Sequence, residues 1–273
     1  MSITFASSKD REQLKAIYQA CFPDDPASFW DFELDHLMQS DNILVYREGD
    51  QILSTVQILP EQLTLQGKIY PVQYIYAAAT LPEAQGRGLM GQLLEEAHAL
   101  ARERGQWFSV LITQNDSLFD FYARFGYRDC GKVGLVQADP AACCGCGKVR
   151  AAEAKDTPKM LELYHRAQCD QLSVARTIET MDLQREIYGT HVLVFETDGV
   201  ITAYGIRIGN RMLEVMGPDA NILLSASNSI CGYTLPTENA TLMRNGCVLP
   251  LTKRAETLLE AQQKIVYLNL MWN

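Results

Sequence analysis

The sequence predicts an α/β protein in which flanking helices cover a mixed central sheet, and in which this unit is apparently duplicated with a degenerate second copy. Three observations predict this fold class. A strand–turn–helix pattern at residues 3–22 recurs at residues 149–168, and a hairpin pattern at residues 42–58 recurs at residues 191–208. A candidate strand at residues 71–80 also leads through a glycine-rich turn into a long amphipathic segment.

The two strand–turn–helix segments agree in detail. Each carries a Lys-Asp pair in its turn, and each helix places apolar residues at helical spacing, namely Leu14, Ile17 and Tyr18 in the first and Met160, Leu163 and Tyr164 in the second. The hairpins turn at Gly49-Asp50 and at Asp198-Gly199. Two matches in the same order indicate a duplicated unit.

The segment DPAACCGCGK, residues 139–148, is short of large apolar residues and separates the two patterned halves. We therefore expect domains at residues 1–138 and 149–273, joined by a linker at 139–148. Cys143, Cys144 and Cys146 in this linker have no second cysteine or histidine pair at a recognised spacing, so we expect no metal site. The second half lacks a glycine-rich turn before a long helix, which assigns the chemistry to the first half.

Composition narrows the classes of partner. The formal net charge is −9 and the pI is about 5.0, which argues against a general nucleic-acid binder and slightly favours a cationic partner. No stretch has the apolar length of a membrane span, and the N-terminus lacks the features of a signal peptide. We expect a cytoplasmic protein with no membrane partner. The sequence gives no indication of oligomeric state.

The glycine-rich turn lies in TLPEAQGRGLMGQLLEEAHALA, residues 80–101. Pro82 marks the end of the preceding strand, and the apolar residues after the turn recur at helical spacing until Gly105. Unpaired backbone N–H groups and the helix dipole at such a helix start favour an anion. The GK[ST] of a P-loop and the G-x-G-x-x-G of a dinucleotide fold are both missing.

The turn resembles the Gcn5-related N-acetyltransferase (GNAT) signature Q/R-x-x-G-x-G/A. Residues 85–89 match it, while Met90 replaces the last small residue. The block at residues 106–131 resembles the next part of that family, with a strand, an Asn-containing bend, a short helix and Tyr122 ahead of Gly126-Tyr127. The order and spacing of the two blocks carry the resemblance over residues 1–138, and the tandem arrangement is similar to the enhanced-intracellular-survival branch.

The resemblance implies a coenzyme A site and an acetyltransferase. The backbone of the turn would hold the pyrophosphate of acetyl-CoA, and the end of the preceding strand would line the pantetheine arm. The residues implied as cofactor-binding are Ala78, Ala79, Thr80, Gln85, Gly86, Arg87, Gly88, Leu89, Met90, Gly91 and Asn115. The reaction implied is acetyl transfer to a primary amine by direct attack in a ternary complex, and the acceptor is a small-molecule or peptide amine.

Tyr122 is the expected general acid, since a phenol with its ordinary pKa near 10 is protonated at neutral pH. The general base is less defined. The segment at residues 22–38 offers Asp31, Glu33 and His36 in the region that shapes the acceptor pocket in this family, although a solvated acidic face explains them equally well. In the enhanced-intracellular-survival branch the C-terminal carboxylate reaches the active site, so the carboxylate of Asn273 is a second catalytic candidate.

A rival function keeps the coenzyme site without the chemistry, as a non-catalytic acyl-CoA-binding regulatory or sensor module. The Tyr122 motif and the intact QGRG favour catalysis, whereas the lack of an obvious base keeps the sensor alternative open.

Overall fold

The computed structural model describes residues 1–37, 41–113, 115–139, 147–168 and 170–271. The strands of the first half are β1 (Ser2–Phe5), β2 (Ile43–Glu48), β3 (Gln51–Leu65), β4 (Lys68–Thr80), β5 (Phe108–Ile112) and β6 (Arg128–Gln137). The helices of this half are α1 (Arg11–Cys21), α2 (Ala27–Leu37), α3 (Leu89–Glu103) and α4 (Asp116–Ala123).

The second half contains strands β7 (Lys148–Ala151), β8 (Ser173–Val174), β9 (Val192–Thr197), β10 (Val200–Ile208), β11 (Arg211–Met216), β12 (Cys231–Thr234), β13 (Thr241–Pro250) and β14 (Val266–Tyr267). Its helices are α5 (Thr157–Gln168), α6 (Ile178–Tyr188), α7 (Ala220–Ala226) and α8 (Lys253–Ala261). The predicted mixed α/β class is therefore confirmed. No helix within the described ranges is long and apolar enough to cross a membrane.

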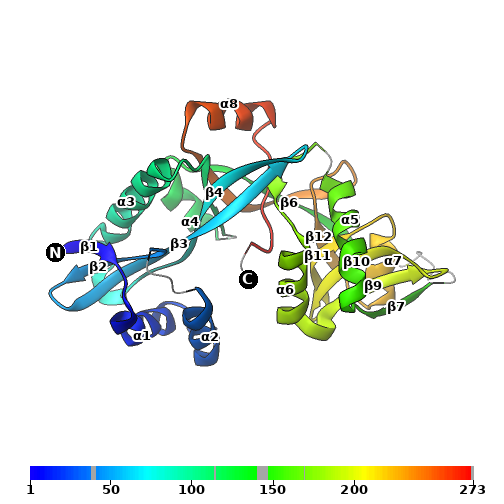
Figure 1. The fold of residues 1–273 in the computed structure, drawn as a ribbon, viewed down its shortest axis with the longest axis horizontal. Helices are drawn as coiled ribbons and strands as arrows, with labels where there is room; N and C mark the ends of the chain where they lie inside the picture. Colours follow the sequence, from blue (N-terminus) through cyan, green and yellow to red (C-terminus); the bar gives the residue numbers. More distant parts are fainter. Residues whose placement is uncertain (38–40, 114, 140–146, 169, 272–273) are drawn as a thin grey trace.

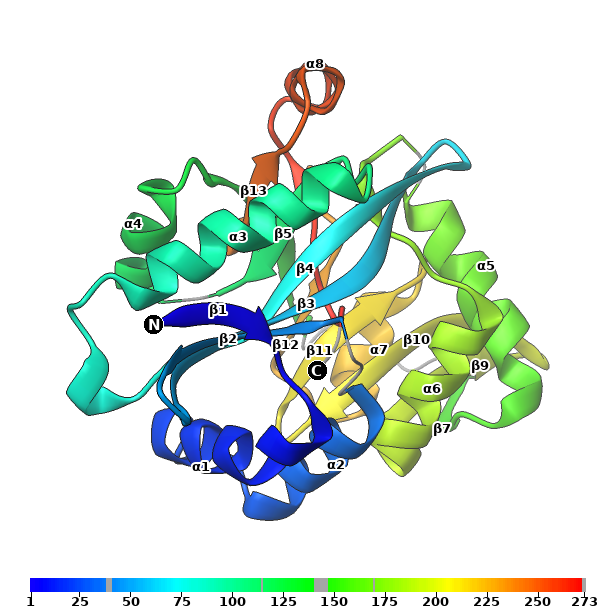
Figure 2. The same ribbon diagram turned by 60° about the vertical axis from the view of Figure 1, so that its left-hand side comes forward.

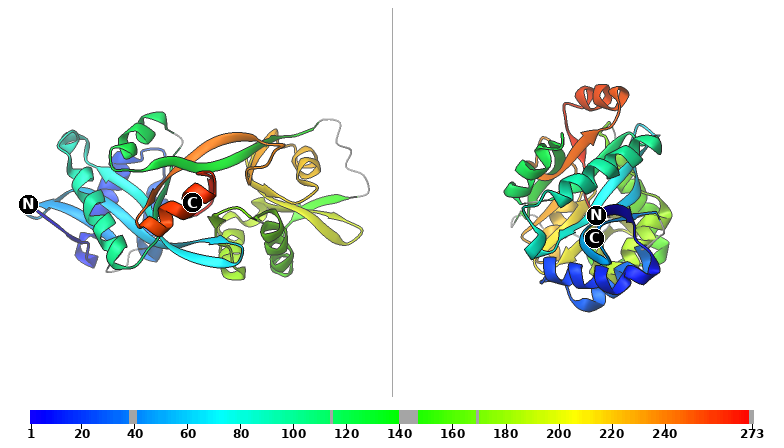
Figure 3. Two further views of the ribbon diagram at one scale, coloured as in Figure 1. Left: turned by 90° about the horizontal axis from the view of Figure 1, so that it is seen from above. Right: turned by 90° about the vertical axis from the view of Figure 1, so that its left-hand side faces the viewer.

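The main strands form one sheet in the order β1-β2-β3-β4-β5-β13-β6-β12-β11-β10-β9-β7. Strand β13 comes from the second half of the chain, yet it lies between β5 and β6 of the first half and is antiparallel to both. Figures 1 and 3 show the two lobes of the molecule, with β6 and β13 running from one lobe into the other. The division at residues 139–148 stays a prediction, but the two halves share strands across it.

Helices cover both faces of the first-half sheet. Figure 2 shows α1 and α2 on one side and α3 and α4 on the other. The alternation within β2 explains this, because Ile43 and Val45 pack with the core under α1 and α2, while Leu44 and Tyr46 pack with the core under α3. A buried aliphatic side chain of this size contributes roughly 1.5–3 kcal/mol relative to an exposed one.

The strand–turn–helix segments at the start of the two halves share a set of contacts. Asp10 accepts a hydrogen bond from the backbone N–H of Ser7, and Asp156 accepts one from the N–H of Glu153. Each aspartate also forms an ion pair with an arginine of a neighbouring strand, Arg47 in the first half and Arg150 in the second. The same local device thus begins α1 and α5. In the second half, the helix that follows β11 is the short α7, which spans only Ala220–Ala226.

A buried histidine links α3 to the sheet. The Nε2 of His98 lies 3.0 Å from the Tyr127 hydroxyl, which in turn lies 2.7 Å from the hydroxyl of Ser109 on β5. Burial lowers the pKa of His98 to about 4, with the nearby Arg102 charge as a smaller cause. His98 is therefore a neutral packing residue in the core under α3 and lies outside the site described below.

We predict that His98 makes the fold sensitive to acid. Its folded pKa of about 4 lies below its ordinary value of 6.5, so its contribution is present above pH 6.5 and is lost as the pH falls towards 4. The difference amounts to about 3 kcal/mol at most. Chemical denaturation between pH 7 and pH 4 should show a smaller loss of stability for His98→Gln than for the wild type. The exposed His165 on α5 gives the control variant His165→Gln, and an equal loss in all three proteins would contradict the prediction.

Candidate functional site

The glycine turn before α3 leaves open space beside its backbone. Gly86 and Gly88 have φ angles of +74° and +76°, in the left-handed region that glycine adopts without strain. A Cβ built on either residue would meet no atom within 4 Å. Gly88 is the N-cap of α3, so the free backbone N–H groups of this helix start lie next to that space. The local structure thus combines open space with an exposed helix start, the two features that the predicted anion site requires.

A cavity of about 580 Å³ lies against this turn. Its walls come from the end of β4, the turn itself, the start of α3, and α4 with the two residues that follow it, namely Ala78, Thr80, Ala84, Gln85, Gly86, Gly88, Leu89, Met90, Gly91, Leu118, Phe121, Tyr122, Arg124 and Phe125. The one cationic side chain among these residues is Arg124. We call this space the turn cavity.

The neighbouring strands separate beside the turn cavity. Parallel pairing between β4 and β5 covers Val72–Phe108, Gln73–Ser109 and Tyr74–Val110, and it ends there. Strand β4 continues to Thr80 and β5 to Ile112 without pairing to each other. The facing backbone groups beyond Tyr74 are therefore available to a third, strand-like partner.

A β-bulge changes the direction of β4 near its end. The register between β3 and β4 shifts so that Tyr76 pairs with Gln57 and Ala79 with Thr55, which leaves two residues of β4 opposite one residue of β3. Ala77 within this bulge has a φ of +43°, a strained value for a residue that carries a Cβ. The bulge lies where β4 parts from β5, between the two cavities.

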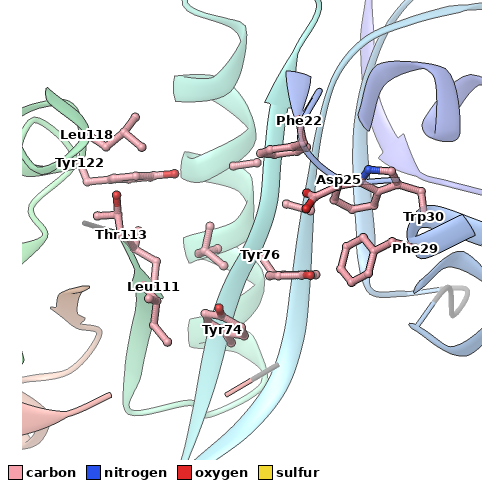
Figure 4. A pocket seen from close by; sticks show the side chains of 14 residues that line it. Phe22, Asp25, Phe29, Trp30, Tyr74, Tyr76, Leu111, Thr113, Leu118 and Tyr122 are labelled. Carbon is pink, nitrogen blue, oxygen red and sulfur yellow. The ribbon is translucent and has the colours of Figure 1, made fainter. Parts of the chain in front are cut away.

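A second cavity, of about 410 Å³, lies on the other side of the separated strands. Figure 4 shows the side chains around it, with Tyr122 and Leu118 on one side and Phe22, Phe29 and Trp30 on the other. Trp30 forms the centre of an aromatic cluster, because its ring lies 4.6 Å from Tyr18, 5.2 Å from Phe22 and 5.0 Å from Phe29. We call this space the aromatic cavity.

The two cavities share three lining residues, Ala78, Leu118 and Tyr122. Tyr122 is 7% exposed, and Figure 4 shows its hydroxyl directed to the middle of the aromatic cavity. Burial raises the pKa of Tyr122 to about 12, so its hydroxyl stays protonated at neutral pH. A proton donor therefore stands where the two cavities meet.

Several residues implied as cofactor-binding have other contacts. The Ala79 carbonyl accepts a hydrogen bond from Ser54 at 3.0 Å, and Ala79 is buried. Arg87 forms an ion pair with Glu48 and does not line the turn cavity. Asn115 is the N-cap of α4, where its side chain accepts a hydrogen bond from the N–H of Ser117. The Ala79 carbonyl and the side chains of Arg87 and Asn115 are thus engaged in contacts with the surrounding structure, whereas the residues of the turn line the cavity.

The three residues of α2 that were expected to bind the acceptor, Asp31, Glu33 and His36, do not lie together in one site. Asp31 forms an ion pair with Lys15 at 2.7 Å and another with Arg11 at 3.2 Å, and it lines neither cavity. Glu33 is buried beneath Tyr76, whose pKa is raised first by burial and then by the Glu33 charge. His36 belongs to α2, but its side chain lies outside the described part of the structure.

Asn273 also lies outside the described residues, but the segment before it is firmly held. Arg176 donates hydrogen bonds to the carbonyls of Asn269 (3.0 Å) and Leu270 (3.1 Å), and Asn245 donates one to the carbonyl of Leu268. Leu268, Leu270 and Met271 pack in the same core as Tyr74, which lines the aromatic cavity. Leu270 and Met271 themselves line another, smaller cavity, together with Arg176 and Gln184.

Sequence reasoning missed the aromatic wall and Arg124. In the segment at residues 22–38 the acidic residues were predicted to bind the acceptor, whereas the rings of Phe22, Phe29 and Trp30 form part of the cavity wall. The spacing of Arg124, two residues after Tyr122 at the end of the same short helix, was the signal for a cation near the turn. No group of three metal-ligating side chains occurs among the described residues, and Cys143, Cys144 and Cys146 lie outside them.

Comparisons with known proteins agree with this geometry. Residues 2–130 match the family model described as an acetyltransferase (GNAT) domain. The sequence matches none of the curated proteins with which it was compared.

Solved structures share the fold of nearly the whole chain. A probable N-acyltransferase from Enterococcus faecalis has a TM-score of 0.71 at 15% identity, over 93% of this chain and 73% of that one. A GCN5-related N-acetyltransferase from Anabaena variabilis has a TM-score of 0.69 at 18% identity, over 92% and 73%. Eis1 from Mycobacterium abscessus has a TM-score of 0.65 at 15% identity, over 92% and 74%. With the family match over the segment that carries the glycine turn and Tyr122, residues 2–130 are a domain of the GNAT acetyltransferase family.

Proposed function

We propose that the chain is an N-acetyltransferase that moves the acetyl group of acetyl-CoA to a primary amine by direct attack in a ternary complex. The observation that carries this proposal is the meeting of two cavities at Ala78, Leu118 and Tyr122, with a protonated hydroxyl between them. One cavity has the features of an anion site, and the other has a mainly apolar lining. Two substrates that react with each other need such an arrangement.

The turn cavity suits the coenzyme. The backbone N–H groups of residues 86–91 would bind its pyrophosphate, because the helix start favours an anion and the glycines admit close approach. Arg124 is the one cationic side chain that lines this cavity, and it would form a charge-assisted hydrogen bond with the coenzyme phosphates. Arg87 is less suited to that role, since it is already paired with Glu48.

The separated strands suit the pantetheine arm. Its amide groups can pair with the free backbone groups of β4 beyond Tyr74, as an added strand would. This places the thioester near Ala78 and Tyr122, where the bulge turns the end of β4. The proposed lining by Ala78 and Thr80 rests on their position in the wall of the turn cavity.

The chemistry needs few protein groups. A neutral amine attacks the thioester carbonyl, a C–N bond forms and the C–S bond breaks, and coenzyme A leaves as a thiolate. The nitrogen loses one proton to a base, and the thiolate gains one from Tyr122. Since burial keeps Tyr122 protonated well above neutral pH, it can act as this acid over the whole physiological range.

For a chain that ends at Asn273, we propose its carboxylate as the base. The support is the fixed course of residues 267–271 along the core that includes Tyr74.

The proposed function makes a first prediction about the glycine turn. Gly88→Glu places a carboxylate in the anion site and should abolish acetyl-CoA binding in calorimetric titration. Gly105→Glu is the matched control, because Gly105 also has a positive φ and open space but lies at the other end of α3. Both variants should lose a similar stability of about 1–2 kcal/mol. Equal binding by both variants would show that the turn does not hold the coenzyme.

The second prediction concerns the acid. Tyr122→Phe should lower kcat by about 10² to 10⁴ in a thiol-release assay and leave the Kd for acetyl-CoA unchanged. Tyr127→Phe is the control, because the buried Tyr127 hydroxyl forms hydrogen bonds with His98 and Ser109 and lines neither cavity. Unchanged turnover in Tyr122→Phe would remove the acid role. A wild type that binds acetyl-CoA but acetylates no amine would indicate the acyl-CoA-binding sensor.

The third prediction concerns the tail. Removal of residues 272–273 should abolish turnover and spare coenzyme binding, whereas Asn273→Ala, which keeps the terminal carboxylate, should remain active. Addition of one glycine after Asn273 should lower kcat, because it moves the carboxylate by about 3.5 Å. Full turnover in the truncated protein would assign the base elsewhere.

A further inference from the structure

The aromatic cavity carries a chemical selectivity that the overall charge of the chain does not indicate. Six of its lining residues are aromatic, namely Phe22, Phe29, Trp30, Tyr74, Tyr76 and Tyr122. Among the described residues that line it, Asp25 carries the one charge, and none is a lysine, arginine or histidine. Its volume of about 410 Å³ suits a ligand of one or two rings.

We propose, on the basis of the proposed acetyltransfer, that the acceptor is a monoamine carried on an aromatic body, an arylalkylamine. The rings of the aromatic cavity hold this body, and Asp25 attracts the protonated amine, whose nitrogen loses its proton to the base before it attacks the thioester.

The aromatic rings of the cavity can bind the ammonium group and the aromatic group of one ligand at the same time. Ring faces carry negative charge density and hold both an aromatic group and an ammonium ion. The buried carboxyl group of Glu33 lies next to Tyr76 and interacts with it. Figure 4 shows Tyr76 and Phe29 close together, with the Asp25 carboxylate above them.

The same walls disfavour two other classes of acceptor. A free amino acid would bring its carboxylate into a cavity that has no cationic lining residue among those described, and an unpaired buried charge is costly. A polyamine or aminoglycoside would bring several ammonium groups to a single lining carboxylate, Asp25. The further ammonium groups would lose hydration without gaining a partner.

The test compares kcat/KM, by thiol release, for 2-phenylethylamine, butylamine, phenylalanine and spermidine. We expect 2-phenylethylamine to exceed butylamine about tenfold through ring contacts, and to exceed phenylalanine about 100-fold because only the latter carries a carboxylate. Spermidine should also be the poorer substrate. A preference for spermidine or phenylalanine would overturn this inference and leave the proposed acetyltransfer intact.

Variants assign the preference to the cavity. Asp25→Asn should raise KM for 2-phenylethylamine about tenfold with little change in kcat, while Asp24→Asn, the adjacent residue outside the cavity lining, should change neither. Phe29→Leu should reduce the preference for 2-phenylethylamine over butylamine. Phe32→Leu, on the same helix but outside the lining, should keep it. Equal effects in Asp25→Asn and Asp24→Asn would overturn the role of Asp25.

Direct binding separates failure of the inference from failure of the proposed function. If no amine is acetylated but 2-phenylethylamine still binds in calorimetry more tightly than butylamine, the acetyltransfer is wrong and the assignment of the cavity holds. If spermidine is acetylated and 2-phenylethylamine neither binds nor reacts, the acetyltransfer holds and the inference is wrong.

Discussion

The separation of β4 from β5 is the constraint on which the rest of the site depends. Pairing stops at Tyr74–Val110, and both strands continue, so backbone donors and acceptors are left facing a gap in the middle of a sheet. Such groups are stable only with water or a ligand as partner. The glycine turn lies on one side of this gap, directly after β4, and the aromatic cavity lies on the other side. The bulge at Ala77 then directs the end of β4 to the point where both cavities meet.

Separated strands need support at their outer edges, and the second half of the chain supplies it. Strand β13 pairs with all of β5, from Phe108 to Ile112, so β5 is held although β4 has left it. The approach is close, since a Cβ on Gly246 would come within 2.2 Å of the Leu111 carbonyl oxygen. Glycine is therefore required there. The second half of the chain thus contributes the strand that holds β5 in place beside the candidate site of the first half.

The features that the sequence predicted are those whose signals are local. The turn at Gly86 and Gly88, the strand and helix around it and the repeated Asp10 and Asp156 starts depend on residues a few positions apart. The insertion of β13 between β5 and β6 depends on contacts more than a hundred residues apart and leaves no periodic pattern. The roles of Phe22, Phe29 and Trp30 were hidden for another reason. Rings that line a cavity and rings that fill a core have the same spacing in a sequence.

The net charge of −9 and the proposed acceptor with a single positive charge are compatible, because the acidic surface and the aromatic cavity act at different distances. Surface charges are screened over about 8–10 Å at physiological ionic strength, so they raise the local concentration of any cation without choosing among them. Many of the carboxylates also have cationic partners, as Asp31 has in Lys15 and Arg11. The choice between cations falls to groups that touch the acceptor. In the aromatic cavity those groups are mainly aromatic rings. A ring contacts the apolar part of an amine as well as its ammonium group, so the rings select for the shape and apolarity of the amine more than for its number of charges.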